Sequence, residues 1–327
     1  MIYFSLVLLS KENIMVIIDF FMKLLNSLPG AVSQGLIWGI MAIGVYITYR
    51  ILDVADLTVD GSFATGGAVG VMCILSGWNL WLSMLMAFIA GLLTGLMTGI
   101  FHVFMGIPAI LSGILSQLSL YSINLKILGK SNQSVNVNNT DLLVSLRWVK
   151  EFAVHNPLIT VGIVIIVLIA LLYWFFGTEM GCGIRATGAN LNMSRAQGIN
   201  TNFNKVLGLM LSNGLVAFSG AFLAQYQGFA DVNMGRGAIV IGLAAVIIGV
   251  ALFSKIFKNF ALKLLSVVLG SVIYYIVITG VITAGFDANL LKLLSALIVA
   301  VFLAIPFWKG KVVKPNVLVK KGGKTDA

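Results

Sequence analysis

Hydrophobic residues occur along this chain in nine long runs that are separated by short polar segments. Each run is close to the roughly 20 residues that a helix needs to cross the hydrocarbon core of a bilayer. Because lipid offers no hydrogen-bond partners to the backbone, a crossing segment of this kind must be helical. The runs cover residues 31–50, 62–77, 80–104, 107–128, 157–176, 206–229, 236–253, 260–283 and 290–308. The pattern predicts an all-α, polytopic membrane helical bundle of roughly eight to ten transmembrane helices.

The composition and the placement of charge refine this picture. Of the 327 residues, 59% are hydrophobic and only 10% are charged, whereas soluble domains carry about 25% charged residues. The net charge of +10 does not indicate nucleic-acid binding, because the basic residues lie between apolar runs and in the tail. The positive-inside rule places the basic tail, 309–327, and the loop 177–205 in the cytoplasm, and the polar loop 129–156 outside. The membrane domain is expected to span 27–308.

The first 26 residues form a separate candidate segment. A short apolar run is interrupted by Lys11 and Glu12, and apolar residues then recur at helical spacing from Ile14 to Leu25. No small-residue cleavage site follows. We expect an amphipathic helix in the membrane interface, with a partial crossing as the alternative.

Small residues form stripes on several predicted helices. Glycines spaced four apart fall on one face of a helix, and in lipid such faces allow two backbones to approach closely. We therefore expect helix contacts at these stripes, and a sliding or gating surface is the less favoured reading. The stripes are Gly91, Gly95 and Gly99; Gly35 and Gly39; and Gly66 and Gly70. The two cysteines, Cys73 and Cys182, lie on different segments, so no disulfide is expected.

Acidic residues cluster where the first main hydrophobic run ends. If residues 50–62 were helical, Asp53, Asp56 and Asp60 would share one face and Arg50 could pair with Asp53. Ionisable groups inside a membrane usually mark a substrate path or a conformational joint. The alternative is a solvated turn, with residues 60–62 capping the helix that follows. A group of polar residues that only stabilises a break in a helix would also fit this pattern.

The loop 177–205 contains a second polar pattern. A short helix is expected to begin near Asn190 and to end at Gly198, with Leu191, Ser194 and Ala196 near one side. From these residues alone, the helix could be a plain connector or a docking site for a partner.

A third polar group lies at the predicted outer end of the run 206–229. Gln225, Tyr226 and Gln227 could line an external entrance. Anchoring of the helix in the membrane interface is an equally common role for such residues.

Enzymatic chemistry finds little support in the sequence. The two histidines, His102 and His155, lie in no metal-binding motif. The segment ending in Gly129 and Lys130 lacks a phosphate-binding loop, because Asn124 stands where that motif needs a glycine. We expect no catalytic residue, no metal and no cofactor, and hence any ATP hydrolysis on a partner.

Two of the polar segments resemble motifs of one family. Residues 53–64 (Asp-Val-Ala-Asp-Leu-Thr-Val-Asp-Gly-Ser-Phe-Ala) and the loop 185–200, with its ending Gly-Ile-Asn, are similar to the permease subunits of bacterial ABC importers of the branched-chain amino acid and ribose type. The runs 214–228 and 237–249 agree in order and spacing, and the resemblance covers about 35–306. The residue sequence of the first motif is most similar to that of the family branch associated with amino acid uptake, aromatic amino acids included.

The resemblance implies roles for these residues. It implies that the loop couples to the ATPase, through Arg185, Gly188, Ala189, Asn190, Ser194, Ala196, Gly198, Ile199 and Asn200. It also implies a joint near the translocation path, at Asp53, Asp56, Thr58, Asp60 and Ser62.

The resemblance further implies a set of partners. They are cytoplasmic ATPase subunits, an extracytoplasmic solute-binding protein or lipoprotein, and a second permease copy in a homodimer, all at a bacterial plasma membrane with its anionic lipid. An ion-coupled secondary transporter remains the chief alternative, and a structural membrane protein the third.

Overall fold

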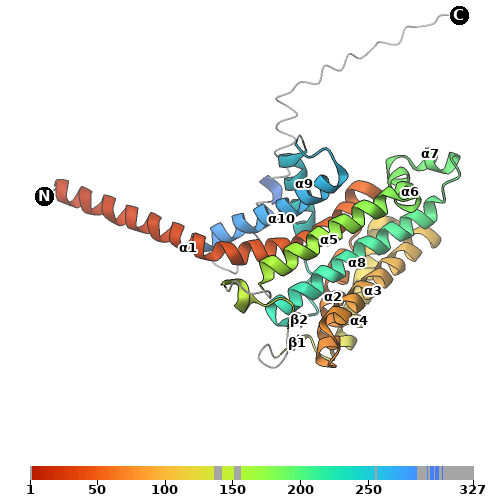
Figure 1. Cartoon of the computed structure of the whole chain (residues 1–327), viewed down its shortest axis with the longest axis horizontal. Coiled ribbons are helices and arrows are strands. Elements are labelled where there is room, and N and C mark those ends of the chain that lie inside the picture. The colour runs from red at the N-terminus through yellow and green to blue at the C-terminus, as the bar shows by residue number, and fades with distance from the viewer. Residues whose placement is uncertain are drawn as a thin grey trace, which may run out of the picture.

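The computed structural model describes residues 2–135, 142–150, 156–254 and 256–285, together with 293, 295–297, 299–301 and 304. These parts of the chain are mainly helical (Figure 1). In chain order the helices are α1 (Ile2–Tyr46), η1 (Ile47–Leu52), α2 (Val59–Leu75), α3 (Leu80–Gly99), η2 (Ile100–Phe104), α4 (Ala109–Leu128), η3 (Leu146–Lys150), α5 (Pro157–Gly177), α6 (Glu179–Ala189), α7 (Leu191–Ala196), α8 (Thr201–Gln227), α9 (Ala238–Phe253) and α10 (Phe260–Thr283).

Eight of the nine predicted hydrophobic runs form helices in this structure, and the ninth, 290–308, lies largely outside the described residues. The helical prediction is therefore confirmed for the described part of the chain. No helix boundary occurs near residue 26, because α1 continues from Ile2 to Tyr46. The membrane contact of the first 26 residues stays a prediction, and the tail 309–327 lies outside the described residues.

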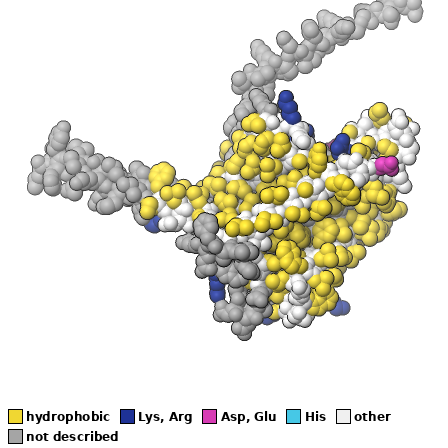
Figure 2. Space-filling model, viewed as in Figure 1, with side chains coloured by type: hydrophobic (Ala, Val, Ile, Leu, Met, Phe, Trp, Pro, Cys, Tyr) yellow, Lys and Arg dark blue, Asp and Glu magenta, His cyan; other side chains and the backbone are white. Residues whose placement is uncertain are grey.

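Several of the helices have the length and composition of membrane spans. Five described segments are long and apolar enough to cross a bilayer: Phe21–Leu52, Leu80–Phe104, Pro157–Gly177, Thr201–Gln227 and Phe260–Thr283. Hydrophobic side chains cover most of the coloured face over α3, α5 and α8, and charged side chains lie near its margins (Figure 2). A bilayer is the solvent that such a face requires, so the chain is a multi-pass membrane protein.

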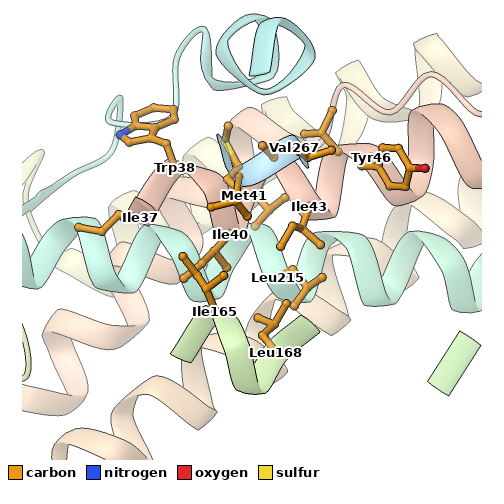
Figure 3. Close-up of a cluster of buried hydrophobic side chains, with 14 of the residues drawn as sticks. Ile37, Trp38, Ile40, Met41, Ile43, Tyr46, Ile165, Leu168, Leu215 and Val267 are labelled. Carbon is orange, nitrogen blue, oxygen red and sulfur yellow. The ribbon is translucent and has the colours of Figure 1, made fainter. Parts of the chain in front are cut away.

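The second half of α1 forms the centre of the bundle. Its apolar side chains contact Ile165 and Leu168 on α5, Leu215 on α8 and Val267 on α10 within one buried cluster (Figure 3). Because α1 is covered on several sides, its membrane-spanning part is hydrophobic all round rather than on one stripe.

Close backbone contacts between helices occur at the predicted glycine stripes. A Cβ added at Gly91 would overlap the backbone oxygen of Asn213, and one at Gly95 would overlap that of Leu209. These overlaps mean that α3 and α8 approach backbone to backbone, as small residues permit in membranes. The stripes at Gly35 and Gly66 lie in the same way against α10 and α8. The predicted contact surfaces are confirmed.

The helical path is interrupted between α1 and α2. A π-helical segment, η1, ends at Leu52, and Asp53 after it adopts a left-handed conformation with φ of 54°. That conformation is uncommon for a residue with a Cβ. Residues 53–56 are not helical, and α2 begins only at Val59. The two shorter apolar helices, α2 and α9, have 17 and 16 residues.

The two polar loops lie at opposite ends of α8 (Figure 1). At one end, strand β1 (Asn132–Ser134) pairs antiparallel with β2 (Phe229–Asp231), with Gln133 opposite Ala230. At the other end lie α6 and α7. Because α8 has 27 residues and is therefore about 40 Å long, it joins these ends across a full membrane thickness. Cys73 and Cys182 are both free, as expected.

Candidate functional site

A buried carboxylate lies at the break between α1 and α2. Asp56 is 3% exposed. One of its oxygens accepts the backbone N–H of Thr58 at 2.9 Å, and the other accepts the side-chain amide of Asn213 on α8 at 2.7 Å. Burying a carboxyl group without hydrogen bonds is costly, and here each oxygen has a donor. The break is thus fixed to α8.

Hydroxyl groups extend this contact to two further helices. The Ser62 hydroxyl donates to Oδ1 of Asn213 at 2.6 Å and lies 2.8 Å from the hydroxyl of Thr94 on α3. The hydroxyl groups of Thr58 and Thr98 are 2.7 Å apart, and Thr98 donates to Ser116 on α4 at 2.8 Å. We call this group the polar network. Its members are Asp56, Thr58, Ser62, Thr94, Thr98, Ser116 and Asn213.

A second carboxylate of the same segment caps a distant helix. Asp60 accepts the backbone N–H of Gly237 and that of Ile239, each at 3.0 Å. These groups belong to the N-terminus of α9, where unpaired N–H groups and the helix dipole favour negative charge. The alternative in which Asp60 helps to cap its own helix, α2, is wrong. Asp60 caps α9 instead, because the break brings the starts of both helices together.

The three aspartates do not share one face. Asp53 is exposed, Asp56 is buried and Asp60 is partly buried. The helix on which the shared face depended is absent at residues 53–56, so the predicted face is wrong. The exposed Arg50 lines a small cavity with Arg185 and Lys263. The expected pairing of Arg50 with Asp53 is not among the interactions of the described residues.

The polar network joins α2, α3, α4 and α8 through hydrogen bonds. In the part of the chain that the structure describes, no three His, Cys, Asp or Glu side chains gather as metal ligands would. Sequence reasoning found Asp56, Thr58, Asp60 and Ser62 but missed Asn213, Thr94, Thr98 and Ser116. A signal for Asn213 existed, since it is an amide in the middle of a long apolar helix, and such groups usually find a partner.

The predicted short helix is present at the opposite end of α8 from the strands. Helix α7 begins after Asn190, whose side chain accepts the N–H of Met193 at 3.0 Å, and Gly198 follows it with φ of 77°. Ser194 is buried whereas Ala196 is exposed, so these two do not lie on one side as expected. In the same loop, Asn200 caps α8 by accepting the N–H of Phe203 at 3.1 Å. Ile199 is partly buried.

Helix α6 connects this loop to the broken segment. A Cβ added at Gly188 would overlap the backbone oxygen of Ile51 in η1. Asn204 of α8 donates to the hydroxyl of Thr187 on α6 at 3.3 Å. The guanidinium of Arg185 donates to the backbone oxygen of Phe176 at 3.4 Å. The exposed Ala189 ends α6. Helix α6 is therefore packed directly on the segment that leads into the polar network.

The predicted external entrance has a different arrangement. Gln225 and Tyr226 are buried, and only Gln227 is exposed. Gln225 accepts the N–H of Leu143 at 3.1 Å and donates to the sulfur of Met84 at 3.1 Å. These contacts fix the polar loop onto α8 and α3. Gln225 and Tyr226 therefore do not line an opening, and this expectation is wrong.

Comparison with known proteins agrees with this architecture. Residues 28–306 match the family model described as the permease component of the branched-chain amino acid transport system. The chain is 39% identical to the tyrosine transport system permease protein of Clostridioides difficile (strain R20291), over 86% of this chain and 91% of that protein. It is 35% identical to uncharacterized protein RP368 of Rickettsia prowazekii (strain Madrid E), over 86% and 98%.

A sugar permease is a more distant relative. The chain is 27% identical to the fructose import permease protein FruF of Bifidobacterium longum (strain NCC 2705), over 83% of this chain and 75% of that protein. The named relatives are permease subunits of transport systems. The family match extends over most of the membrane bundle, including the polar network and the α6–α7 loop. The chain belongs to the family of permease components of branched-chain amino acid transport systems.

Proposed function

We propose that this chain is the membrane subunit of an ATP-driven importer and that it carries an amino acid, aromatic amino acids included, across a bacterial plasma membrane. In this proposal ATPase subunits bind at the α6–α7 loop in the cytoplasm. A solute-binding protein or lipoprotein delivers the solute outside, and two copies of the chain form the path. The 39% identity to a tyrosine transport permease supports the amino acid as cargo.

One observation carries the coupling part of the proposal. Helix α6 contacts η1 at Gly188 without room for a side chain. The segment after η1 contains Asp56, which is hydrogen-bonded to α8. A displacement of the α6–α7 loop therefore acts directly on the break between α1 and α2. Interfaces packed this closely shift as units between discrete arrangements rather than deform smoothly.

The break also fits a part that moves during transport. Asp60 on α2 holds the start of α9, so the two short helices are joined at their N-termini. Broken helices at membrane depth are the usual sites of substrate contact and motion in transporters. We assign Asp56, Thr58, Asp60 and Ser62 to this joint. The exposed Asp53 is a flanking residue of the joint.

Reconstitution tests the proposal against an ion-coupled transporter. The purified chain would be placed in proteoliposomes with the ATPase and the binding protein, and uptake of radiolabelled L-tyrosine would be measured. We expect uptake only when ATP and both partners are present. The control omits the ATPase and imposes a proton or sodium gradient. Gradient-driven uptake by the chain alone would overturn the proposal.

A further inference from the structure

A cavity with both polar and apolar walls lies beside the joint. It has a volume of about 470 Å³ and opens between α2, α4 and the segment that precedes α9. This size is within the range of small-molecule sites in proteins. We call it the α4 pocket. It is lined by Asp60, Gly61, Ile114, Gln117, Leu118, Tyr121, Asn124, Val232, Asn233 and Arg236.

Two amides of the α4 pocket have unused hydrogen-bonding capacity. Asn124 is 1% exposed, and its Nδ2 donates to the backbone oxygen of Gly61 at 3.4 Å. Among the described residues, its Oδ1 has no hydrogen-bond partner, and neither has the buried Oδ1 of Asn233. Buried polar atoms are nearly always paired, so two unpaired amide oxygens beside one cavity indicate a ligand or water there.

The pocket combines both signs of charge with an apolar wall. Asp60 supplies a carboxylate whose oxygens each have lone pairs beyond the hydrogen bonds to α9. Arg236 is exposed and supplies a guanidinium, which binds carboxylates by paired hydrogen bonds. Ile114, Leu118 and Val232 provide apolar surface. An ammonium group, a carboxylate and an apolar side chain on one small molecule would satisfy all of these groups.

Helix α4 itself differs from the lipid-facing spans. It has 20 residues, yet it is not among the five described segments that are apolar enough to cross a bilayer by composition. The pocket side of the helix carries an amide and a hydroxyl, Gln117 and Tyr121, in addition to Asn124. Polar side chains of this kind face a cavity or a partner rather than lipid, because lipid leaves their hydrogen bonds unmade.

We infer that the α4 pocket is a solute subsite of the translocation path and that it takes zwitterionic α-amino acids. Arg236 contacts the carboxylate, whereas Asp60 and the oxygens of Asn124 and Asn233 contact the ammonium group. This inference rests on the proposed function and adds a site to it. Because Asp60 also holds the start of α9, a solute in this pocket contacts the group that joins the two short helices.

Thiol labelling tests the pocket without the binding protein. Gln117→Cys and Ser119→Cys are each made in a background in which Cys73 and Cys182 are replaced by serine. The assembled transporter is then treated with a membrane-impermeant, charged thiol reagent. Gln117 lines the pocket, whereas Ser119 is exposed on α4 but does not line it. We expect Gln117→Cys to react at least about tenfold faster, because thiolates form in water and not in lipid. Equal rates would overturn the inference.

Protection from labelling identifies the ligand class. A panel of L-amino acids, phenethylamine and ribose, each at millimolar concentration, would be added before the reagent. We expect one or more amino acids to slow the reaction of Gln117→Cys. Phenethylamine, which lacks a carboxylate, and ribose, which lacks both charges, should not slow it. No protection by any amino acid, or equal protection by ribose, contradicts the assignment.

Uptake separates this inference from the proposed function. In proteoliposomes with ATPase and binding protein, Asn124→Leu and Arg236→Gln should each lower L-tyrosine uptake by about tenfold, the loss of roughly one hydrogen bond to a charged group. Ser122→Ala, an exposed change on the same helix outside the pocket, is the control. All variants would first be checked for assembly by gel filtration. If the wild type imports and both pocket variants import equally well, the pocket is not a subsite. If the wild type imports nothing, the proposed function fails.

Discussion

Asn213 on α8 donates its side-chain amide to a carboxylate oxygen of Asp56 at 2.7 Å, although 157 residues separate the two in the chain. The bond joins the break after α1 to the middle of α8. Asn213 also donates to the backbone oxygen of Leu209 at 3.0 Å and accepts from Ser62. A single amide therefore connects three parts of the bundle.

Removing this amide should destabilise the bundle. Asn213→Ala leaves one oxygen of the buried Asp56 without its donor, which costs about 1–3 kcal/mol. We expect a lower midpoint of thermal unfolding in detergent. Asn202→Ala is the matched control, because Asn202 lies on the same helix and is exposed. If both variants melted at the wild-type temperature, the amide would contribute nothing to stability.

The charge of Asp60 should matter for the start of α9. Asp60→Asn keeps one accepting oxygen, places an NH2 group against the other backbone N–H of α9 and removes the negative charge near the helix N-terminus, at a cost of about 1–3 kcal/mol. We expect a lower melting temperature and reduced solute uptake. The control is Asp53→Asn, because Asp53 is exposed and belongs to no described hydrogen bond to α9. If Asp60→Asn is expressed normally and takes up solute at the wild-type rate, the assignment of Asp60 to the joint is wrong.

Because α3 packs closely on α8, a methyl group added at Gly91 should destabilise the protein. Gly91→Ala places a methyl group against the backbone of Asn213 and the side chain of Ala217. We expect a loss of about 1–3 kcal/mol in the free energy of unfolding, because overpacking forces the helices apart. Gly162→Ala on α5 meets no described atom within 4 Å and should be neutral. Thermal melts of the two variants provide the comparison, and equal stability would contradict the packing.

Substitutions at two adjacent residues should separate binding of the ATPase from the contact between α6 and η1. Ala189→Trp alters an exposed position at the end of α6, so we expect loss of co-purification with the ATPase while the permease remains folded. Gly188→Ala overlaps η1 and should lower the melting temperature of the permease itself. Gel filtration and pull-down with the tagged ATPase measure the two effects. Full ATPase binding by Ala189→Trp would exclude that surface as the docking site.

Much of the fold could be predicted from the sequence. The helices follow from runs of apolar residues, since a chain in lipid must close its backbone hydrogen bonds within each segment. The contact stripe at Gly91 and Gly95 was also predictable, because a spacing of four places small residues on one face. Asn190 and Gly198 marked the two ends of the short helix α7 for similarly local reasons.

The candidate site was only half predictable. Asp56 and Asp60 stood out because acids near a membrane core are rare. Their assumed helix was wrong, since Asp53 takes a left-handed conformation and the chain leaves the helix there. Gln225 was read as an entrance residue, yet it is buried against Met84 and Leu143. Local patterns report how polar a position is and do not report what it contacts.

The sequence by itself determined that this protein crosses a membrane many times and where its helices lie, because both depend on apolar content over about 20 residues. The tertiary structure alone decided that Asp56 meets Asn213, that Asp60 caps α9 and that Oδ1 of Asn124 has no hydrogen-bond partner among the described residues. The physical reason is the distance along the chain over which each interaction acts. Helix formation is fixed within a few turns of chain, whereas a buried polar group must find its partner wherever packing places one.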